Sequence, residues 1–195
     1  ENLNAGGGDD QFIIQVGGSL TGFIDGGAGT DTVDFSALAT AINATVANVG
    51  GTDGVDINEA TIANGMTNIN QFVSGSASTD TLTGFNGVSN WVLTPGTASG
   101  TYQTGIGLLS FDSFESLLGG TAGDTFVIGG ADGAVVQNLD GGAGADTVQF
   151  SGNTISVAQT LSNMESMTIT VSDVAVNTAL SLDSLTMLGG TLGGT

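Results

Sequence analysis

Short apolar runs rich in β-branched residues recur along the chain between clusters of Gly, Asn, Asp and Ser. Examples lie at 12–16 (FIIQV), 125–128 (TFVI) and 167–171 (MTITV). Runs of this length, bounded by turn-forming residues, predict β-strands. Gly fills 34 of the 195 positions, a density that disfavours long helices, and only residues 36–42 show a short helical spacing. The pattern therefore predicts an all-β chain.

Part of the chain is duplicated. Residues 1–36 align with residues 115–151 once a single residue is inserted. Chance does not produce such a match over this length. We therefore divide the chain into a first repeat unit at 1–36, a β-rich insert with a degenerate repeat at 37–112, and a second unit with C-terminal strands and a tail at 113–195. The matched residues include Glu1 and Glu115, Asp10 and Asp124, Phe12 and Phe126, Asp31 and Asp146, and Phe35 and Phe150.

A nine-residue motif, G-G-x-G-x-D-x-U-x with U a large apolar residue, occurs intact at 26–34 and 141–149. Degraded copies lie at 5–13, 75–83 and 119–127. The glycines of such a motif allow a tight turn with positive φ, and the Asp adds a charged oxygen to the carbonyl oxygens of the turn. Hard oxygen donors of this kind suit Ca²⁺. The U residue points inward and anchors the short strand that follows.

These segments resemble the haemolysin-type calcium-binding (RTX) repeats of secreted bacterial toxins, adhesins and surface-layer proteins. The resemblance covers five nine-residue segments and is specific in the two intact ones. It implies a parallel β-solenoid of the β-roll type with Gly- and Asp-rich turns that bind Ca²⁺, export from the cell, and folding triggered by external calcium. Residues 37–112 are either part of the same solenoid or a β-sandwich-like insert. The implied metal ligands are Asp31 and Asp146, followed by Asp10, Asp124 and Asp80, in turns formed by Gly26, Gly27, Gly29, Gly141, Gly142 and Gly144.

The spacing of the motifs departs from the tandem arrangement of that family. The copies start at positions 5 and 26 in the first unit and at positions 119 and 141 in the second. Both intervals are close to one turn of a β-roll, which uses two motifs. We therefore expect 5–13 to stack on 26–34, and 119–127 on 141–149, with Ca²⁺ between them. The alternative is a metal-free corner in which each Asp makes an Asx-type hydrogen bond.

Four further acidic residues stand at repeated positions. Asp25 and Asp140 directly precede the two intact motifs and are either additional calcium ligands or turn residues. Glu115 and Glu165 recur where related segments open, which favours a capping role over chemistry.

Two other groups leave alternatives open. Asp53, Asp56 and Glu59 form an acidic cluster, which a solvated loop explains better than one more cation site. Trp91 and Tyr102 flank a turn, and we expect them to pack in the core rather than to form an exposed sugar-binding platform.

The charge of the chain is entirely negative. It has no Lys, Arg, His or Cys, and 19 Asp and Glu residues give a net charge of −19. Nucleic acids and anionic membrane surfaces are therefore poor partners, and no apolar stretch is long enough to span a bilayer. Tetrahedral zinc sites, thiol nucleophiles and His-based acid–base catalysis are excluded. Because no carboxylate can pair with a cationic side chain, we expect bound Ca²⁺ to relieve the repulsion and to couple to folding.

Together these features favour an extracellular bacterial structural protein that binds calcium and, in its presence, assembles with copies of itself into a fibre, matrix or surface layer. The alternative is a passive or ligand-binding segment of a large secreted RTX-type adhesin. A cell-surface or matrix polysaccharide is a second candidate partner. Paired carboxylates can hydrolyse glycosides, but the sequence offers no catalytic constellation, so we do not expect an enzyme.

Overall fold

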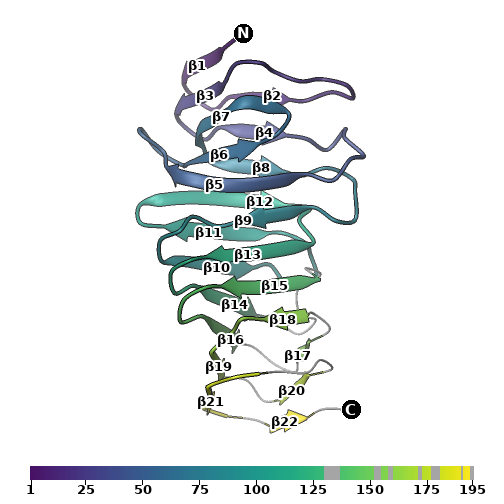
Figure 1. Ribbon diagram of the computed structural model, residues 1–195, viewed down its shortest axis with the longest axis vertical. Coiled ribbons are helices and arrows are strands. Elements are labelled where there is room, and N and C mark those ends of the chain that lie inside the picture. The colour runs from purple at the N-terminus through teal and green to yellow at the C-terminus, as the bar shows by residue number, and fades with distance from the viewer. Residues whose placement is uncertain are drawn as a thin grey trace.

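The computed structural model is all-β over the residues that it describes (Figure 1). The strands form two large mixed sheets, here sheets A and B, and a small sheet C, and within each sheet successive strands follow one another along the long axis of the molecule. No helix capable of crossing a membrane occurs in this part of the chain. The described residues are 1–129, 137–151, 155–157, 160–170, 173–176, 181–189 and 191–193, so part of the expected C-terminal tail lies outside them.

Sheet A has nine strands, and all of its neighbouring pairs are parallel except those that involve β6. In spatial order the strands of sheet A are β1 (Leu3–Gly7), β3 (Ile24–Ala28), β7 (Ile62–Ile69), β6 (Val55–Glu59), β5 (Asn43–Val49), β9 (Thr81–Thr83), β13 (Ser116–Gly120), β15 (Asn138–Gly142) and β18 (Thr160–Ser162).

Sheet B has ten strands, of which only β11 is antiparallel to its neighbours, and sheet C is parallel throughout. In spatial order sheet B contains β2 (Gln11–Ile13), β4 (Thr32–Asp34), β8 (Gln71–Val73), β12 (Gly107–Asp112), β11 (Gly100–Thr104), β10 (Ser89–Leu93), β14 (Thr125–Gly129), β16 (Thr147–Ser151), β19 (Ser166–Ile169) and β21 (Ser184–Met187), and sheet C contains β17 (Ile155–Val157), β20 (Asp173–Val176) and β22 (Thr191–Gly193).

The chain alternates between sheets A and B through most of its length, and we call a strand of sheet A with the following strand of sheet B a rung. The rung β1–β2 stacks on β3–β4, and equivalent motif positions pair, as Phe12 does with Val33. The rung β13–β14 stacks on β15–β16 in the same manner, as the pairing of Phe126 with Val148 shows. The expected stacking of the motif copies is therefore confirmed.

Two antiparallel meanders interrupt this alternation. Strands β5, β6 and β7 follow one another in sheet A, and β10, β11 and β12 do so in sheet B. Residues 37–112 therefore extend the two large sheets, and the idea that they form a sandwich of their own is wrong. The outer strands of the first meander pair with β3 and β9, and those of the second pair with β8 and β14. Their main-chain hydrogen bonds are therefore made within sheets A and B.

Aromatic side chains fill the space between the sheets. Trp91 stacks on Phe126 with ring centroids 5.6 Å apart and an interplanar angle of 9°. The ring centroid of Tyr102 lies 4.4 Å from that of Trp91. Both Trp91 and Tyr102 are fully buried, which confirms core packing for this pair. Residues 36–42 form no helix, because Leu38 and Ile42 both turn into the core as the chain crosses from β4 to β5.

Candidate functional site

Buried aspartates occupy the corners where the chain crosses between the two large sheets. Asp31, Asp124 and Asp146 each directly precede a strand of sheet B, whereas Asp80 directly precedes a strand of sheet A. All four side chains are at most 1% exposed. Asp and Glu are almost never buried this completely without a partner, and this chain contains no cationic side chain.

In the first unit, one carboxylate joins successive rungs. Asp31 Oδ1 accepts the main-chain N–H of Asp10 at 3.0 Å, one rung earlier. The N–H of Asp31 in turn donates to Oδ1 of Asn70 at 3.0 Å, in the rung that follows. The corner is thus held by side-chain acceptors that continue the ladder of main-chain bonds around the turn.

The second unit repeats this arrangement over a longer column. Asp124 Oδ1 accepts the N–H of Ser89 at 2.9 Å and also its hydroxyl. Asp146 Oδ1 accepts the N–H of Asp124 at 2.7 Å, and Oε2 of Glu165 accepts the N–H of Asp146 at 2.7 Å. Three consecutive carboxylates therefore cap the N–H groups above them.

Asp80 makes the same contacts at the opposite corner. Its Oδ1 accepts the N–H of Ile42 at 2.8 Å, and its own N–H donates to Oε2 of Glu115 at 2.8 Å. The expected capping role of Glu115 and Glu165 is confirmed, since each accepts a main-chain N–H from the rung above.

The first glycine of each intact motif makes room for the aspartate of the same motif. A Cβ added at Gly26 would lie 2.6 Å from Oδ2 of Asp31 and 2.5 Å from the carbonyl oxygen of Asn68. A Cβ at Gly141 would lie 2.7 Å from Oδ2 of Asp146. Only a Cα hydrogen fits beside these oxygens, where it can form a weak C–H···O contact. The later glycines have positive φ, namely Gly27 (95°), Gly29 (142°), Gly142 (89°) and Gly144 (144°).

One oxygen of each buried aspartate lacks a partner. Oδ2 of Asp31, Asp80, Asp124 and Asp146 is buried, and no described residue places a donor within hydrogen-bonding geometry of it, although the N–H of Gly120 stabilises the Asp124 carboxylate. Burial raises the pKa of Asp31, Asp124 and Asp146 above the ordinary value of 3.8, although main-chain N–H donors partly offset this effect. For Asp31, the negative charge of Asp10 adds to the increase in pKa. These corners therefore favour a compensating proton or cation.

Asp25 and Asp140 both accept a hydrogen bond from an asparagine side chain. Asp25 alternates with the inward-facing Gly26 along β3, so its side chain faces away from Asp31. Its Oδ1 accepts the Nδ2 amide of Asn68 at 2.7 Å, and Asp140 Oδ1 accepts the amide of Asn163 at 2.6 Å. Both residues thus pair with Asn. Asp140 Oδ1 also accepts the N–H of Gly142 within the turn at 3.0 Å, and the negative charge of Asp140 adds to the increase in the pKa of Asp146.

The acidic residues of the β5–β6 hairpin were expected in a solvated loop. Instead, Asp53 Oδ2 accepts the N–H of Gly29 at 3.0 Å, and Asp56 Oδ1 accepts the N–H of Asn68 at 3.3 Å. Burial raises the pKa of Asp56. Glu59 instead makes a local contact, in which its Oε2 accepts the N–H of Thr61 in the turn that follows β6. Asp53 reaches the first motif only because the hairpin folds back, and no local signal in the sequence shows this.

The corners match Ca²⁺ in the kind of donor that they offer, but the glycine Cα fills the space beside Oδ2, so an ion would enter only if the turn moved. Gly26 lies beside both Oδ2 of Asp31 and the carbonyl oxygen of Asn68. Gly141 lies in the same way beside Oδ2 of Asp146 and the carbonyl oxygen of Asn163. Ca²⁺ takes about 6–8 oxygen ligands. Within the described residues, no three acidic side chains are gathered around one point, so main-chain carbonyl oxygens would supply most of the ligands.

Comparison of the chain with protein-family models, with curated proteins and with solved structures found no match.

Proposed function

We propose that this chain is an extracellular, calcium-binding structural protein, a parallel β-solenoid interrupted by two meanders, whose copies assemble into a fibre, matrix or surface layer. The open ends of the stack carry this proposal. Among the described strands, β2 at one end of sheet B and β21 at the other each have a single neighbour, and the same holds for β1 in sheet A. Exposed edge strands of this kind are templates for pairing with another chain.

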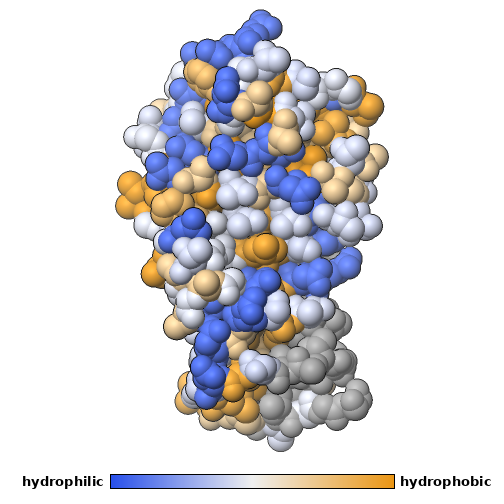
Figure 2. Space-filling model, viewed as in Figure 1, coloured by the Kyte–Doolittle hydropathy of each residue, from blue (hydrophilic) through white to orange (hydrophobic). Residues whose placement is uncertain are grey.

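Apolar side chains are exposed at the same two ends. Ile13 in β2 is 51% exposed, and Leu185 and Met187 in β21 are 44% and 41% exposed. Figure 2 shows hydrophobic residues at the lower end of the molecule, where Figure 1 places β21. A stack of repeats whose ends are unpaired and carry exposed apolar side chains gains free energy by continuing into another stack.

The corner carboxylates support the role of calcium. The chain has 19 acidic residues and no cationic side chain, so no side chain can neutralise the unpartnered oxygens of Asp31, Asp124 and Asp146. These three residues, with neighbouring main-chain carbonyl oxygens, would hold Ca²⁺. Bound calcium would supply positive charge between adjacent rungs and so stabilise the folded chain.

Sedimentation velocity and negative-stain imaging of the purified chain, in millimolar calcium and again in excess chelator, test the proposal. We expect large particles in calcium that dissolve to single chains in chelator. Folded single chains under both conditions would contradict assembly and would favour the segment of a large adhesin. Particles that persist unchanged in chelator would support assembly and contradict the role of calcium.

A further inference from the structure

The duplicated unit occurs in two different settings. Strands β1 to β4 correspond in sequence to β13 to β16, since residues 1–36 align with residues 115–151. The second copy lies in the middle of the stack, with β9 paired on β13 and β10 paired on β14. No described strand covers β1 and β2 in the same way. The neighbours of β13 and β14 therefore indicate which kind of strand could pair with the edge strands β1 and β2.

The polar groups of the two copies match. Glu115 accepts the N–H of Asp80 from the rung above, and Asp124 accepts the N–H of Ser89. Glu1 and Asp10 hold the corresponding positions in the first unit, and no described residue donates a hydrogen bond to either carboxylate. The first rung thus presents two acceptors at positions that are occupied in the internal copy.

The apolar groups match as well. Leu117 and Phe126 are completely buried beneath the preceding rung. Leu3, which corresponds to Leu117, is 39% exposed, and Phe12, which corresponds to Phe126, is only partly buried. The same sequence unit is therefore covered in one place and uncovered in the other.

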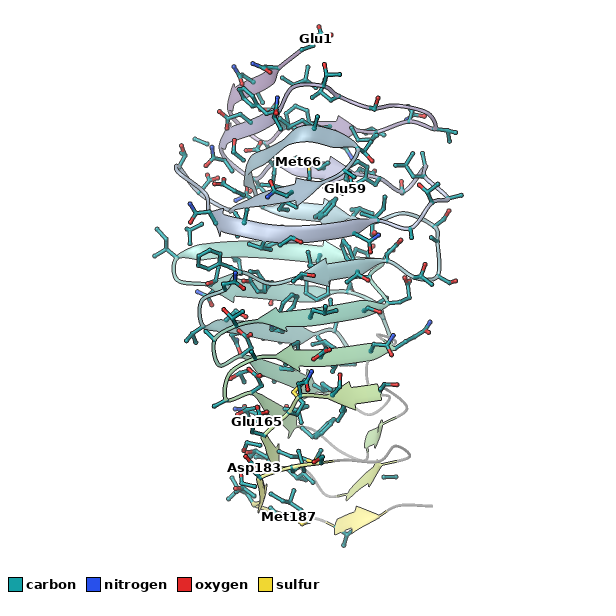
Figure 3. All side chains as sticks on the ribbon, viewed as in Figure 1. Glu1, Glu59, Met66, Glu165, Asp183 and Met187 are labelled. Carbon is teal, nitrogen blue, oxygen red and sulfur yellow. The ribbon has the colours of Figure 1, made fainter. Side chains whose placement is uncertain are left out.

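The far end of sheet B offers a strand of the right direction. All strands of this sheet except β11 run in the same direction. The two edge strands, β2 and β21, are therefore parallel to each other. Leu185 continues the inward-facing positions, as its pairing with Met167 shows. Figure 3 shows Glu1 at one end of the molecule and Met187 at the other.

We propose that copies of this chain join head to tail, with β21 of one copy as the parallel neighbour of β2 in the next. Corner residues set the register, because Asp183 and Asp10 each directly precede their strand. In this register Leu185 lies beside Phe12 and Met187 lies beside Ile14. The contact rests on the proposed self-assembly and specifies its partner as a second copy of the same chain. Two stacked carboxylates, Asp183 and Asp10, then meet at the join, so calcium or protons favour it.

Engineered disulfides test this contact directly, because the chain has no cysteine of its own. Gln11 and Ser184 are exposed and would face each other across the join. The variant with Gln11→Cys and Ser184→Cys, oxidised in calcium, should give a ladder of covalent multimers on a non-reducing gel. Ile13→Cys with Thr186→Cys, in the same register, should do the same.

The matched control pairs Ser184→Cys with Gln103→Cys, whose position is exposed in the middle of sheet B. This control should remain free of ladders. Large particles by sedimentation without ladders from either head-to-tail pair would overturn the join and leave self-assembly intact. Single chains by sedimentation would overturn both. Equal ladders from the control, or dimers from Ser184→Cys alone in equal yield, would also overturn the join.

Discussion

The Asp146 carboxylate accepts the main-chain N–H of Asp124 at 2.7 Å, across one rung of the stack. The second oxygen of the same carboxylate is buried and has no hydrogen-bond partner. One side chain therefore combines a structural contact that needs no metal with an unsatisfied charge that favours a cation or a proton. Substitutions can separate these two roles.

Replacing Asp146 by Asn should raise stability in chelator and weaken the effect of calcium. The amide oxygen still accepts the N–H of Asp124, and the buried charge is removed, which we expect to add about 1–3 kcal/mol to the free energy of unfolding. Thermal unfolding by circular dichroism, with and without calcium, measures both effects. Asp112→Asn is the control, because this exposed side chain accepts only the N–H of Ser113 among the described residues. An Asp146→Asn variant as responsive to calcium as the parent would show that calcium binds elsewhere.

Replacing Asp146 by Ala should leave the chain less stable than the Asn variant, with or without calcium. The buried N–H of Asp124 then loses its acceptor, at a cost of about 1–3 kcal/mol. Urea unfolding of the Ala variant and the Asn variant, compared under identical conditions, isolates this one hydrogen bond. Equal stability of the two variants would mean that the corner contact contributes nothing measurable.

Replacing Gly141 by Ala should disrupt the second motif. The added Cβ would lie 2.0 Å from the carbonyl oxygen of Asn163 and 2.6 Å from the Cβ of Asp146, so the turn must shift. We expect a loss of at least about 2 kcal/mol. Gly51→Ala is the matched control, since a Cβ there meets nothing within 4 Å. Similar melting temperatures for the two variants would contradict the packing of Asp146 against Gly141.

In the absence of calcium, stability should fall as the pH rises. Burial raises the folded-state pKa of Asp31, Asp124 and Asp146 above the ordinary value of 3.8. Between that value and the raised one, the folded state holds more protons than the unfolded state, so the free energy of unfolding falls with pH. The contribution is complete below the ordinary pKa and lost above the raised pKa. Urea titrations in chelator at a series of pH values measure the slope.

A variant that carries Asp31→Asn, Asp124→Asn and Asp146→Asn is the control for this slope. It should show a shallower dependence, since only the general repulsion among the remaining acidic groups then responds to pH. Stability that instead rises with pH in the parent chain would contradict the raised pKa values.

The parts of the fold that depend on local sequence could be predicted. The motif around Gly26 and Asp31 sets a turn of fixed length before β4, and the interval between the two motif copies places Phe12 over Val33. Trp91 and Tyr102, which flank a turn, are buried in the core as the sequence predicts. In these places each residue interacts mainly with the adjacent rung.

The meanders and the corner contacts depend on distant residues and could not be predicted. The N–H of Ile42 donates to Asp80, although nothing about an isoleucine indicates a hydrogen-bonded corner. Asp53 bonds Gly29 only because the β5–β6 hairpin folds back against the first unit. Whether Asp25 faces Asp31 or Asn68 depends on which residues of β3 face inward, and the motif alone does not specify this.

The meander in sheet A also affects the order in which the chain can fold. After β4 the chain enters β5, which pairs with β6 and β9 and not with β3. The place beside β3 is filled only when β7 arrives, after the chain has reversed twice. Folding therefore cannot proceed from the N-terminal end by adding one rung after another, as it can in an uninterrupted repeat protein. Strand β3 gains its second neighbour only when residues 62–69 have paired with it. We expect this long-range pairing to limit the rate of folding.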